Sequence, residues 1–254
     1  MTEEQYNSRR GIYLLPNLLT TGAMFCGFYA IVAGMNSKFE AAAIAVFIAM
    51  ILDGLDGRVA RMTNTQSEFG AEYDSLSDLI SFGLAPALVM YQWALVHMKE
   101  MGVNWGKAGW LAAFIYVACA ALRLARFNTQ IGKVDKRYFV GLPSPASAAI
   151  MVGMVWVFND LQVQGQSLQI PALLMTLFAG LLMVSNVSFY SFKELDLKNK
   201  VPFLAVLIIV LIFALTTIDP PKVLFAVFMA YSLSGPLIWV LRHYKKLRRK
   251  QKET

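Results

Sequence analysis

Six of the sixteen acidic residues of this chain lie within the single stretch DGLDGRVARMTNTQSEFGAEYDSLSD. Four of them are aspartates at helical spacing, because Asp53 and Asp56 are three residues apart and Asp74 and Asp78 are four apart. Residues three or four apart lie on one face of a helix. The short polar segment between the two pairs favours antiparallel helices, so all four carboxylates are expected to converge on one pocket.

Four clustered carboxylates would repel one another and would lose hydration, so the cluster requires cations. Carboxylate oxygens without neighbouring His or Cys ligands suit hard ions. The two histidines of the chain, His97 and His243, are remote from the cluster in the sequence. The aspartates therefore predict a site for two Mg²⁺ or Mn²⁺ ions, with coordination positions left for a phosphate ligand.

The first pair of aspartates shares its helix face with Gly57, Ala60 and Arg61. Small residues allow a bulky ligand to approach the helix, and a planar guanidinium suits phosphate oxygens. One or two of the aspartates could instead pair with Arg58 or Arg61 to hold helices together, but four carboxylates exceed that need. Ionisable groups within membrane segments usually mark function, so the pattern indicates a functional site.

The elements that must position this cluster are apolar. Hydrophobic residues make up 57% of the 254 residues and charged residues only 15%, with a mean hydropathy of +0.52, whereas soluble domains are about one-quarter charged. We therefore predict an all-α fold, a polytopic membrane helix bundle with about eight transmembrane helices. The eight apolar segments begin near Tyr13, Phe39, Ser75, Ala108, Pro143, Gln169, Val201 and Val223.

Basic residues predict the orientation of these segments. If the N-terminus is cytoplasmic, nineteen of the twenty-three Lys and Arg residues fall on the cytoplasmic side, as the positive-inside bias requires. We expect an integral protein of the cytoplasmic (inner) membrane, with both termini and the active site facing the cytoplasm. The net charge of +7 is mostly this topological signal, and nucleic acid is not an expected partner.

A single membrane domain is expected. Residues 1–12 would form a cytoplasmic N-terminal segment, residues 13–243 a transmembrane catalytic domain, and residues 244–254 a basic cytoplasmic tail. The charge of this tail could bind anionic headgroups of the lipid bilayer. The longest loop is expected over residues 128–142.

The spacing D-x-x-D-G-x-x-A-R-x8-G-x-x-x-D-x-x-x-D, read from Asp53 to Asp78, is similar to the signature of the CDP-alcohol phosphotransferases. Two further stretches, LLPNLLTTGAMFCGFYAI and LRLARFNTQ followed by FVGLPSPASA, look like the bacterial membrane-integrated phosphatidylserine synthases within that family. The resemblance covers roughly the first 150 residues. It implies a six-helix core, commonly in a homodimer, so two of the predicted helices are additional.

The resemblance also implies a reaction, in which the phosphatidyl group of CDP-diacylglycerol passes to L-serine and CMP is released. Matched to the family motif, Asp53 and Asp74 would bridge two ions, Asp56 would bind one ion and Asp78 the other. Asp78 would also be the general base. The residues that would contact CDP-diacylglycerol are Asn17, Thr20, Gly57, Arg61 and Ser67.

A serine acceptor carries a carboxylate, which needs a cationic or amide partner. Arg123 and Arg126 are three residues apart near the cytoplasmic end of a predicted span, and Asn128 lies just beyond them. These three residues, together with Ser144, are candidates for the serine pocket. The arginines could equally anchor their helix at the membrane interface, and Asn17 and Ser144 could simply begin helices.

Other functions stay open. The same chemistry could use choline, glycerol-3-phosphate or inositol as the acceptor. A divalent-cation channel or transporter is a different class of function that could also use acidic residues in the membrane. The channel is less favoured, because these carboxylates gather at one membrane face, whereas a conduction path needs polar positions in both halves of several spans.

Overall fold

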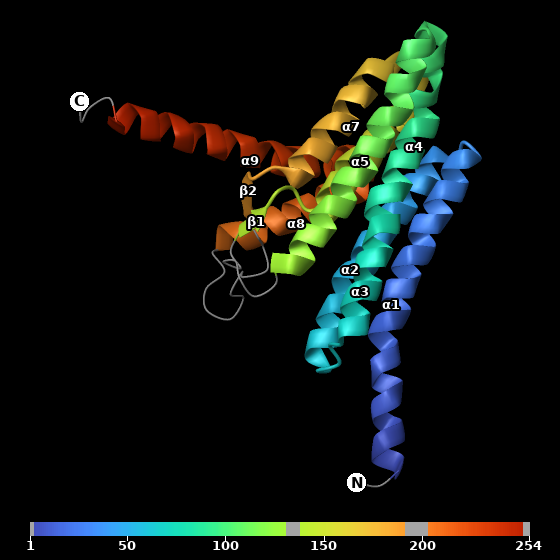
Figure 1. Cartoon of the computed structure of the whole chain (residues 1–254), viewed down its shortest axis with the longest axis vertical. Coiled ribbons are helices and arrows are strands. Elements are labelled where there is room, and N and C mark those ends of the chain that lie inside the picture. Colours follow the sequence, from blue (N-terminus) through green and yellow to red (C-terminus); the bar gives the residue numbers. More distant parts are fainter. Residues whose placement is uncertain (1–2, 131–137, 191–202, 251–254) are drawn as a thin grey trace.

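The computed structural model describes residues 3–130, 138–190 and 203–250, and most of them are helical (Figure 1). Residues 131–137 of the predicted loop and residues 251–254 of the predicted tail lie outside the described residues. The α-helices are α1 (Glu3–Met35), α2 (Phe39–Met62), α3 (Glu68–Asp78), α4 (Ala85–Trp93), α5 (Val103–Gln130), α6 (Ser144–Asp160), α7 (Gln169–Val184), α8 (Phe203–Ile218) and α9 (Pro220–Lys250).

Shorter elements connect these helices. The π-helix η1 (Leu79–Leu84) joins α3 to α4, and the 3₁₀ helices η2 (Leu95–Met101) and η3 (Gly165–Leu168) precede α5 and α7. Strands β1 (Tyr138–Val140) and β2 (Ser188–Tyr190) pair antiparallel, with Phe139 opposite Phe189. The all-α prediction is therefore confirmed for the bundle, to which the chain adds this two-stranded ribbon.

Helices α1 and α2 pack closely because the residues between them are small. A tight turn joins the two helices, with Ser37 at a φ of 58°. Small side chains let membrane helices approach one another closely. The buried alanines of this pair are Ala23, Ala30, Ala33, Ala42, Ala43, Ala45 and Ala49.

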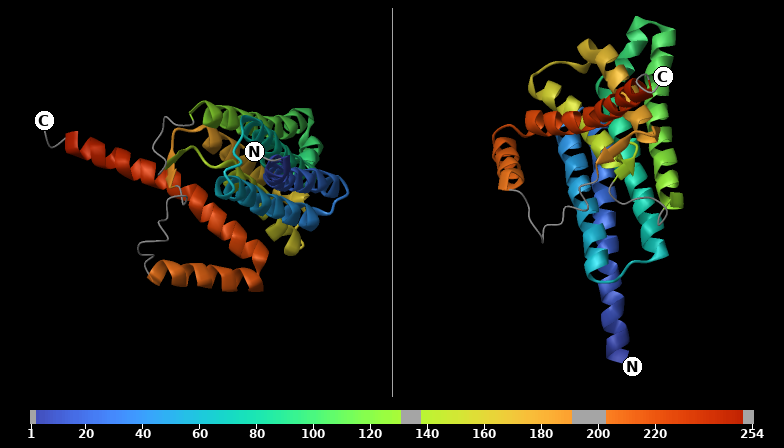
Figure 2. Two further views of the ribbon diagram at one scale, coloured as in Figure 1. Left: turned by 90° about the horizontal axis from the view of Figure 1, so that it is seen from below. Right: turned by 90° about the vertical axis from the view of Figure 1, so that its left-hand side faces the viewer.

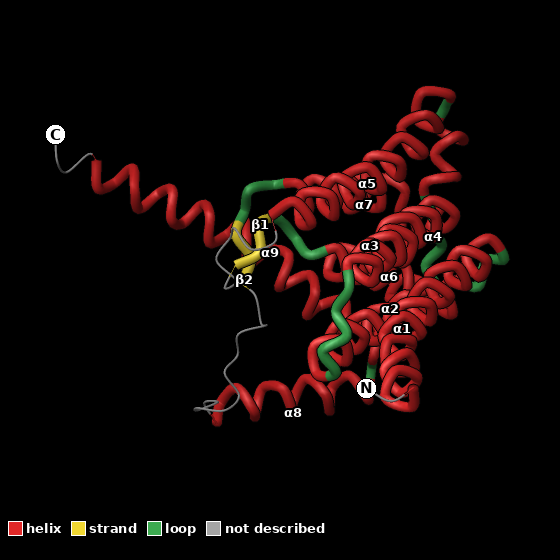
Figure 3. Tube along the Cα trace, turned by 60° about the horizontal axis from the view of Figure 1, so that its bottom comes forward, coloured by secondary structure: helices red, strands yellow, loops and turns green. Residues whose placement is uncertain are grey.

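Helix α6 forms the centre of the bundle (Figure 3). Every residue from Ser144 to Val157 other than Pro145 is buried, which fits a sequence that is apolar or small on all sides. Helices α2, α4, α7 and α9 pack around it. The start of α6 is therefore buried too, and the polar side chain of Ser144 lies inside the protein.

The backbone widens directly after Asp78. Residues Leu79–Leu84 form a π-helix, in which the N–H of Ala85 donates to the carbonyl of Ile80. Such wide turns inside longer helices are rare and often lie at functional sites. This one separates the aspartates of α3 from the apolar helix α4.

Pro86 explains the wide turn. It has no N–H, so it cannot satisfy the carbonyl of Phe82 four residues earlier. The hydroxyl of Tyr116 on α5 donates to that carbonyl at 3.0 Å instead. The buried ring of Tyr116 thereby fixes the π-helix against α5.

Four segments of the described residues are long and apolar enough to cross a membrane, namely 15–35, 103–129, 165–184 and 220–241. The bent segment from α3 to η2 makes a fifth candidate. Each of the eight predicted apolar segments overlaps a helix, but α6 and α8 have only 17 and 16 residues. The structure therefore supports a polytopic bundle with four or five such helices, and the count of eight stays a prediction.

Helix α1 begins at Glu3, so Asn17 lies inside it, and the alternative interpretation that Asn17 begins a helix is wrong. The N-terminal turns of α1 extend beyond the other helices, at the end of the bundle where α2 connects to α3 (Figure 1). At the other end of the chain, the C-terminal half of α9 projects away from the bundle, and α8 lies outside the bundle and leads into the N-terminal half of α9 (Figure 2).

Candidate active site

Three carboxylates of the motif meet between α2 and α3. One oxygen each of Asp53, Asp56 and Asp74 lies within 4.8 Å of the other two. Asp56 is buried, with 4% of its surface exposed, and Asp53 and Asp74 are half-buried. The predicted convergence of the two helices is confirmed for these three residues.

Asp78 lies one helical turn beyond Asp74 and joins the cluster from the side. Its carboxyl group lies close to that of Asp53. It also interacts electrostatically with Asp74 and with the guanidinium of Arg123. Asp78 is therefore influenced both by the other carboxylates and by a buried cation.

Helix α1 holds the buried aspartate in place. The hydroxyl of Thr20 donates to Oδ2 of Asp56 at 2.6 Å, and Thr20 is itself buried, with 4% of its surface exposed. The Ser77 hydroxyl of α3 donates to the backbone carbonyl of Thr20 at 3.1 Å. One turn of α1 thus contacts both acidic helices.

A cavity of about 400 Å³ lies beside the carboxylates, between α1, α2, α3 and the segment that connects α2 to α3. Asp56 and Asp74 line it, which places two of the acidic groups in its wall. All of the residues predicted to contact CDP-diacylglycerol also line this cavity: Asn17, Thr20, Gly57, Arg61 and Ser67.

The connecting segment shapes the mouth of this cavity. Ser67 caps α3, because its hydroxyl accepts a hydrogen bond from the N–H of Gly70 at 3.0 Å. A side chain at Gly70 would approach the Ser67 hydroxyl to 3.1 Å. The glycine of the motif thus leaves room for the cap.

Arg123 and Ser144, two of the candidates for the serine pocket, contact each other. The Nη1 atom of Arg123 donates to the hydroxyl of Ser144, and 9% of the surface of Arg123 is exposed. Its Nε atom is buried without a hydrogen-bond partner among the described residues. A buried guanidinium with a spare donor, next to Asp78, is suited to an anionic ligand.

Arg126 has a different environment. Its guanidinium donates to the backbone carbonyls of Val140, Met183 and Val184 at 2.9 to 3.1 Å. Gly141, at a φ of 82°, lies against this guanidinium, and a side chain there would meet the Met183 carbonyl at 2.2 Å. Arg126 therefore joins the ribbon segment to the end of α7 and so positions the start of α6.

Asn128 is directed toward α3. Its amide donates to the Ser75 hydroxyl at 3.0 Å, so it joins the end of α5 to the acidic helix. The structure thus brings Arg123 and Ser144 together. Arg126 instead binds backbone carbonyls, and Asn128 binds Ser75.

Several residues that line the cavity were not predicted from the sequence. They are Pro16, Thr65, Gln66, Ala71 and Phe127. Thr65 and Gln66 belong to the polar segment that connects α2 to α3. Because this segment lies between the two acidic pairs in the sequence, its residues could have been predicted to lie near the site. Phe127 carries no such signal, because an apolar residue in an apolar helix has no distinguishing chemistry.

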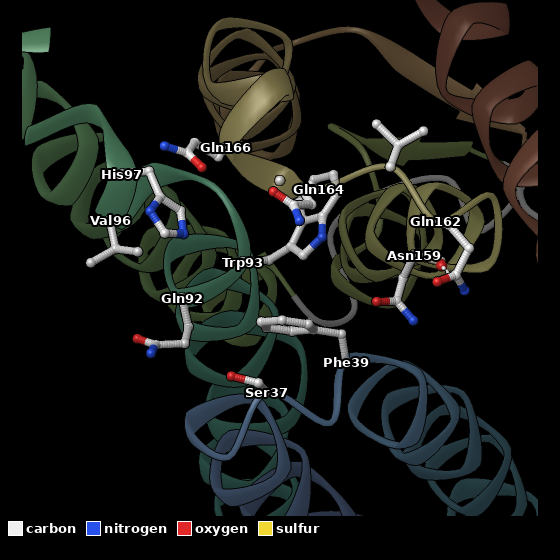
Figure 4. A pocket seen from close by; sticks show the side chains of 12 residues that line it. Ser37, Phe39, Gln92, Trp93, Val96, His97, Asn159, Gln162, Gln164 and Gln166 are labelled. Atoms are coloured by element: carbon white, nitrogen blue, oxygen red, sulfur yellow. Dashed lines mark hydrogen bonds between the residues drawn. The ribbon is translucent and has the colours of Figure 1, made fainter. Parts of the chain in front are cut away.

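A second, polar pocket of about 420 Å³ lies at the opposite end of α2 (Figure 4). It is formed by the turn after α1, the end of α4 and the segment between α6 and α7. Side-chain amides dominate its lining, with Trp93 and His97 among them. No carboxylate lines this pocket, so the two ends of the bundle have distinct chemistry.

The chain matches the CDP-alcohol phosphatidyltransferase family over residues 13–189, which is more than half of its length. Together with the cluster of motif aspartates, this match establishes that the chain belongs to that family of membrane transferases. The match ends before α8 and α9.

The names of curated relatives specify a reaction more closely than the family description does. A CDP-diacylglycerol–serine O-phosphatidyltransferase of Helicobacter pylori is 36% identical over 242 residues, which cover 95% of this chain and 97% of the relative. The Bacillus subtilis protein of the same name is 33% identical over 187 residues, covering 73% of this chain and 94% of the relative. A Methanocaldococcus jannaschii protein of that name is 37% identical over 144 residues, covering 57% and 61%.

Members of this family use divalent metal ions, and the donor set of the cluster fits such ions. The converging ligands are carboxylate oxygens, which hard cations prefer. Burial of Asp56 beside two further carboxylates would be costly without a compensating cation.

We predict that Asp53→Asn weakens Mn²⁺ binding by about tenfold or more, because it removes a charged ligand of the cluster. Binding can be measured by electron paramagnetic resonance on the purified protein in detergent, without any substrate. Asp160→Asn, at the exposed end of α6 beside the opposite pocket, is the matched control. Equal Mn²⁺ affinity in both variants would contradict a metal site at the cluster.

Proposed function

We propose that this chain transfers the phosphatidyl group of CDP-diacylglycerol to L-serine, forming phosphatidylserine and releasing CMP. The observation that carries the proposal is the position of the four aspartates. Three of them, Asp53, Asp56 and Asp74, meet between α2 and α3, and two of these line the cavity of motif residues. The fourth, Asp78, interacts electrostatically with the buried guanidinium of Arg123. The names of the relatives from Helicobacter pylori and Bacillus subtilis support the same reaction.

Two Mg²⁺ or Mn²⁺ ions would be held by the cluster. Asp53 and Asp74 would bridge both ions, Asp56 would bind one and Asp78 the other. When bound, the ions would stabilise negative charge on the attacking and leaving oxygens. Asn17, Thr20, Gly57, Arg61 and Ser67 would hold the cytidine diphosphate in the cavity beside them.

Asp78 would act as the general base. The serine hydroxyl would give its proton to the Asp78 carboxylate as its oxygen bonds to the phosphorus that carries diacylglycerol. The bond from that phosphorus to the CMP oxygen would break, and CMP would leave. Support for this role is that Asp78 interacts electrostatically with two of the other aspartates and with Arg123, the candidate ligand of the acceptor.

Arg123 would bind the carboxylate of serine, with the Ser144 hydroxyl beside it. The support is its burial and its spare Nε donor. Arg126 and Asn128 would support the walls of this pocket, since their side chains donate to backbone carbonyls and to Ser75. A buried cation also favours serine over choline, whose headgroup is cationic.

The membrane arrangement is part of the proposal. All eight apolar segments would cross the cytoplasmic membrane, with a six-helix core and two additional helices. Residues 1–12 and 244–254 and the active site would face the cytoplasm, and the catalytic domain would span residues 13–243. The protein would form a homodimer, and its basic tail would contact anionic headgroups.

CMP release tests the function directly. The purified protein, given CDP-diacylglycerol and Mg²⁺ or Mn²⁺, should release CMP when L-serine is added, and should release little with choline, glycerol-3-phosphate or inositol. EDTA should abolish the reaction, and either metal should restore it. Turnover that requires a different acceptor would refute the serine assignment, and full turnover in metal-free buffer would refute the role of the ions.

The roles of two aspartates can be separated by substitution. Asp78→Asn should lower kcat by about 10² to 10⁴, the usual contribution of a general base, and largely keep the donor affinity. Asp53→Asn should weaken donor binding, because it disturbs both ions that would contact the diphosphate. Calorimetry with CDP-diacylglycerol and Mg²⁺ measures the affinities, and Glu72→Gln on the exposed face of α3 is the control. Near-normal turnover of Asp78→Asn would exclude it as the base.

The two arginines of α5 should also differ. Arg123→Lys keeps the charge but loses the planar fork, so the KM for serine should rise about tenfold while the donor KM stays unchanged. Arg126→Ala leaves three carbonyls without their donor, so the thermal midpoint in detergent should fall by several degrees. A larger rise of the serine KM in Arg126→Ala than in Arg123→Lys would reverse this assignment.

A further inference from the structure

The hydroxyl of Thr20 is directed toward another helix rather than along its own. Serine and threonine side chains inside a helix can donate to the carbonyl four residues earlier, and the neighbouring Thr21 does so, at 2.7 Å from the carbonyl of Asn17. The Thr20 hydroxyl lies 3.1 Å from the corresponding carbonyl of Pro16, but only 2.6 Å from Oδ2 of Asp56 on α2. Because a hydroxyl has a single hydrogen to donate, the shorter bond, to a charged acceptor, is favoured.

This hydrogen bond restrains the carboxylate of Asp56. Each of the two residues has only 4% of its surface exposed, so water competes little for the contact. The last bond of an aspartate side chain has broad rotational freedom, and a fixed donor to one oxygen sets the direction of both. Asp56 also belongs to the group of three carboxylates whose oxygens converge between α2 and α3. Thr20 therefore controls how one member of this group faces the others.

Thr20 is itself fixed by the other acidic helix. Its backbone carbonyl accepts a hydrogen bond from the Ser77 hydroxyl of α3 at 3.1 Å. One turn further on, the Ala23 carbonyl accepts a hydrogen bond from the Ser81 hydroxyl of η1 at 3.0 Å. A side chain at Gly27 would meet the backbone of Ser81 at 2.7 Å, so the glycine lets α1 lie directly against η1. Thr20 thus contacts α2 through its side chain and α3 through its backbone.

We infer that Thr20 is a positioning residue for the metal site, where its hydroxyl holds the Asp56 carboxylate in the direction that receives a divalent ion before any nucleotide binds. Hydrogen-bond partners of ligating carboxylates commonly tune metal affinity in this way. The inference rests on the proposed function, in which Asp56 binds one of the two ions. The oxygen of the Thr20 hydroxyl can still accept a hydrogen bond from the nucleotide, so the two roles of this residue are compatible.

The alternative is that Thr20 acts on the nucleotide alone. Substitutions separate the two roles, because valine has the shape of threonine without the hydroxyl, whereas serine keeps the hydroxyl. We expect Thr20→Val to weaken Mn²⁺ binding about tenfold or more, and Thr20→Ser to change it less than about twofold. Thr20→Ala also lacks the hydroxyl and should show the same loss as Thr20→Val. Electron paramagnetic resonance on the full-length protein in detergent, without substrate, measures these affinities.

Thr21→Val is the matched control. It removes a hydroxyl one residue away on the exposed side of α1, where the partners are the Asn17 carbonyl and the Tyr73 hydroxyl. Its Mn²⁺ affinity should equal that of the unmodified protein. The thermal midpoint of each variant in metal-free detergent solution shows whether the variant is folded.

The metal dependence of turnover gives a second measurement. In Thr20→Val, the Mn²⁺ concentration that gives half-maximal CMP release should rise about tenfold, and saturating Mn²⁺ should restore most of kcat. A role limited to the nucleotide would instead leave the Mn²⁺ affinity unchanged and raise the KM for CDP-diacylglycerol, which added metal would not correct.

Equal Mn²⁺ affinity in folded Thr20→Val or Thr20→Ala and in the unmodified protein would overturn the inference. An equal loss of affinity in Thr20→Ser would also overturn it, because the hydroxyl would then not be the cause. An unmodified protein that binds Mn²⁺, loses this binding in Thr20→Val and yet releases no CMP with serine would contradict the proposed function alone.

Discussion

The burial of negative charge at the end of a membrane helix pair is the constraint on which the rest of this structure depends. Three carboxylates share a space less than 5 Å across, and one of them is almost fully buried. Such a group is tolerated only with hydrogen bonds and compensating cations. Thr20 supplies a hydrogen bond, Arg123 supplies a positive charge beside Asp78, and the cluster has the ligands for metal ions. Helices α1, α3 and α5 are arranged around this single requirement.

The same constraint explains the polar contacts at the start of α6. Arg123 is a buried cation, and it needs both an acidic neighbour and a hydrogen-bond acceptor. Ser144 can accept its hydrogen bond only because the chain before α6 is held in place by Arg126 and the glycine turn at Gly141. Arg126 thus binds the backbone, whereas the Nε atom of Arg123 has no hydrogen-bond partner among the described residues. The two residues look alike in the sequence but have different partners in the fold.

The features that follow from local spacing could be predicted from the sequence. The carboxylates of α2 and α3 lie within a short motif together with the cavity residues Gly57, Arg61 and Ser67, and helical periodicity brings the carboxylates of each helix to one face. The separate environments of Arg123 and Arg126 could not be predicted, because two of the three carbonyls that Arg126 binds, those of Met183 and Val184, lie 57 and 58 residues away in the chain. The same applies to the ribbon of β1 and β2, whose two strands lie about 50 residues apart in the chain.

The π-helix after Asp78 changes which face of the following helix points toward the core. In a π-helix each N–H bonds to the carbonyl five residues earlier, whereas in an α-helix it bonds to the carbonyl four residues earlier. The segment η1 therefore contains one residue more than a regular α-helix would. Each residue of an α-helix turns the chain by about 100°, so the faces before and after η1 are out of phase by that angle. The acidic face of α3 therefore does not continue along α4. An aligned protein that lacks one residue between Leu79 and Leu84 would keep the aspartates in place but would present a different face of α4 to the core.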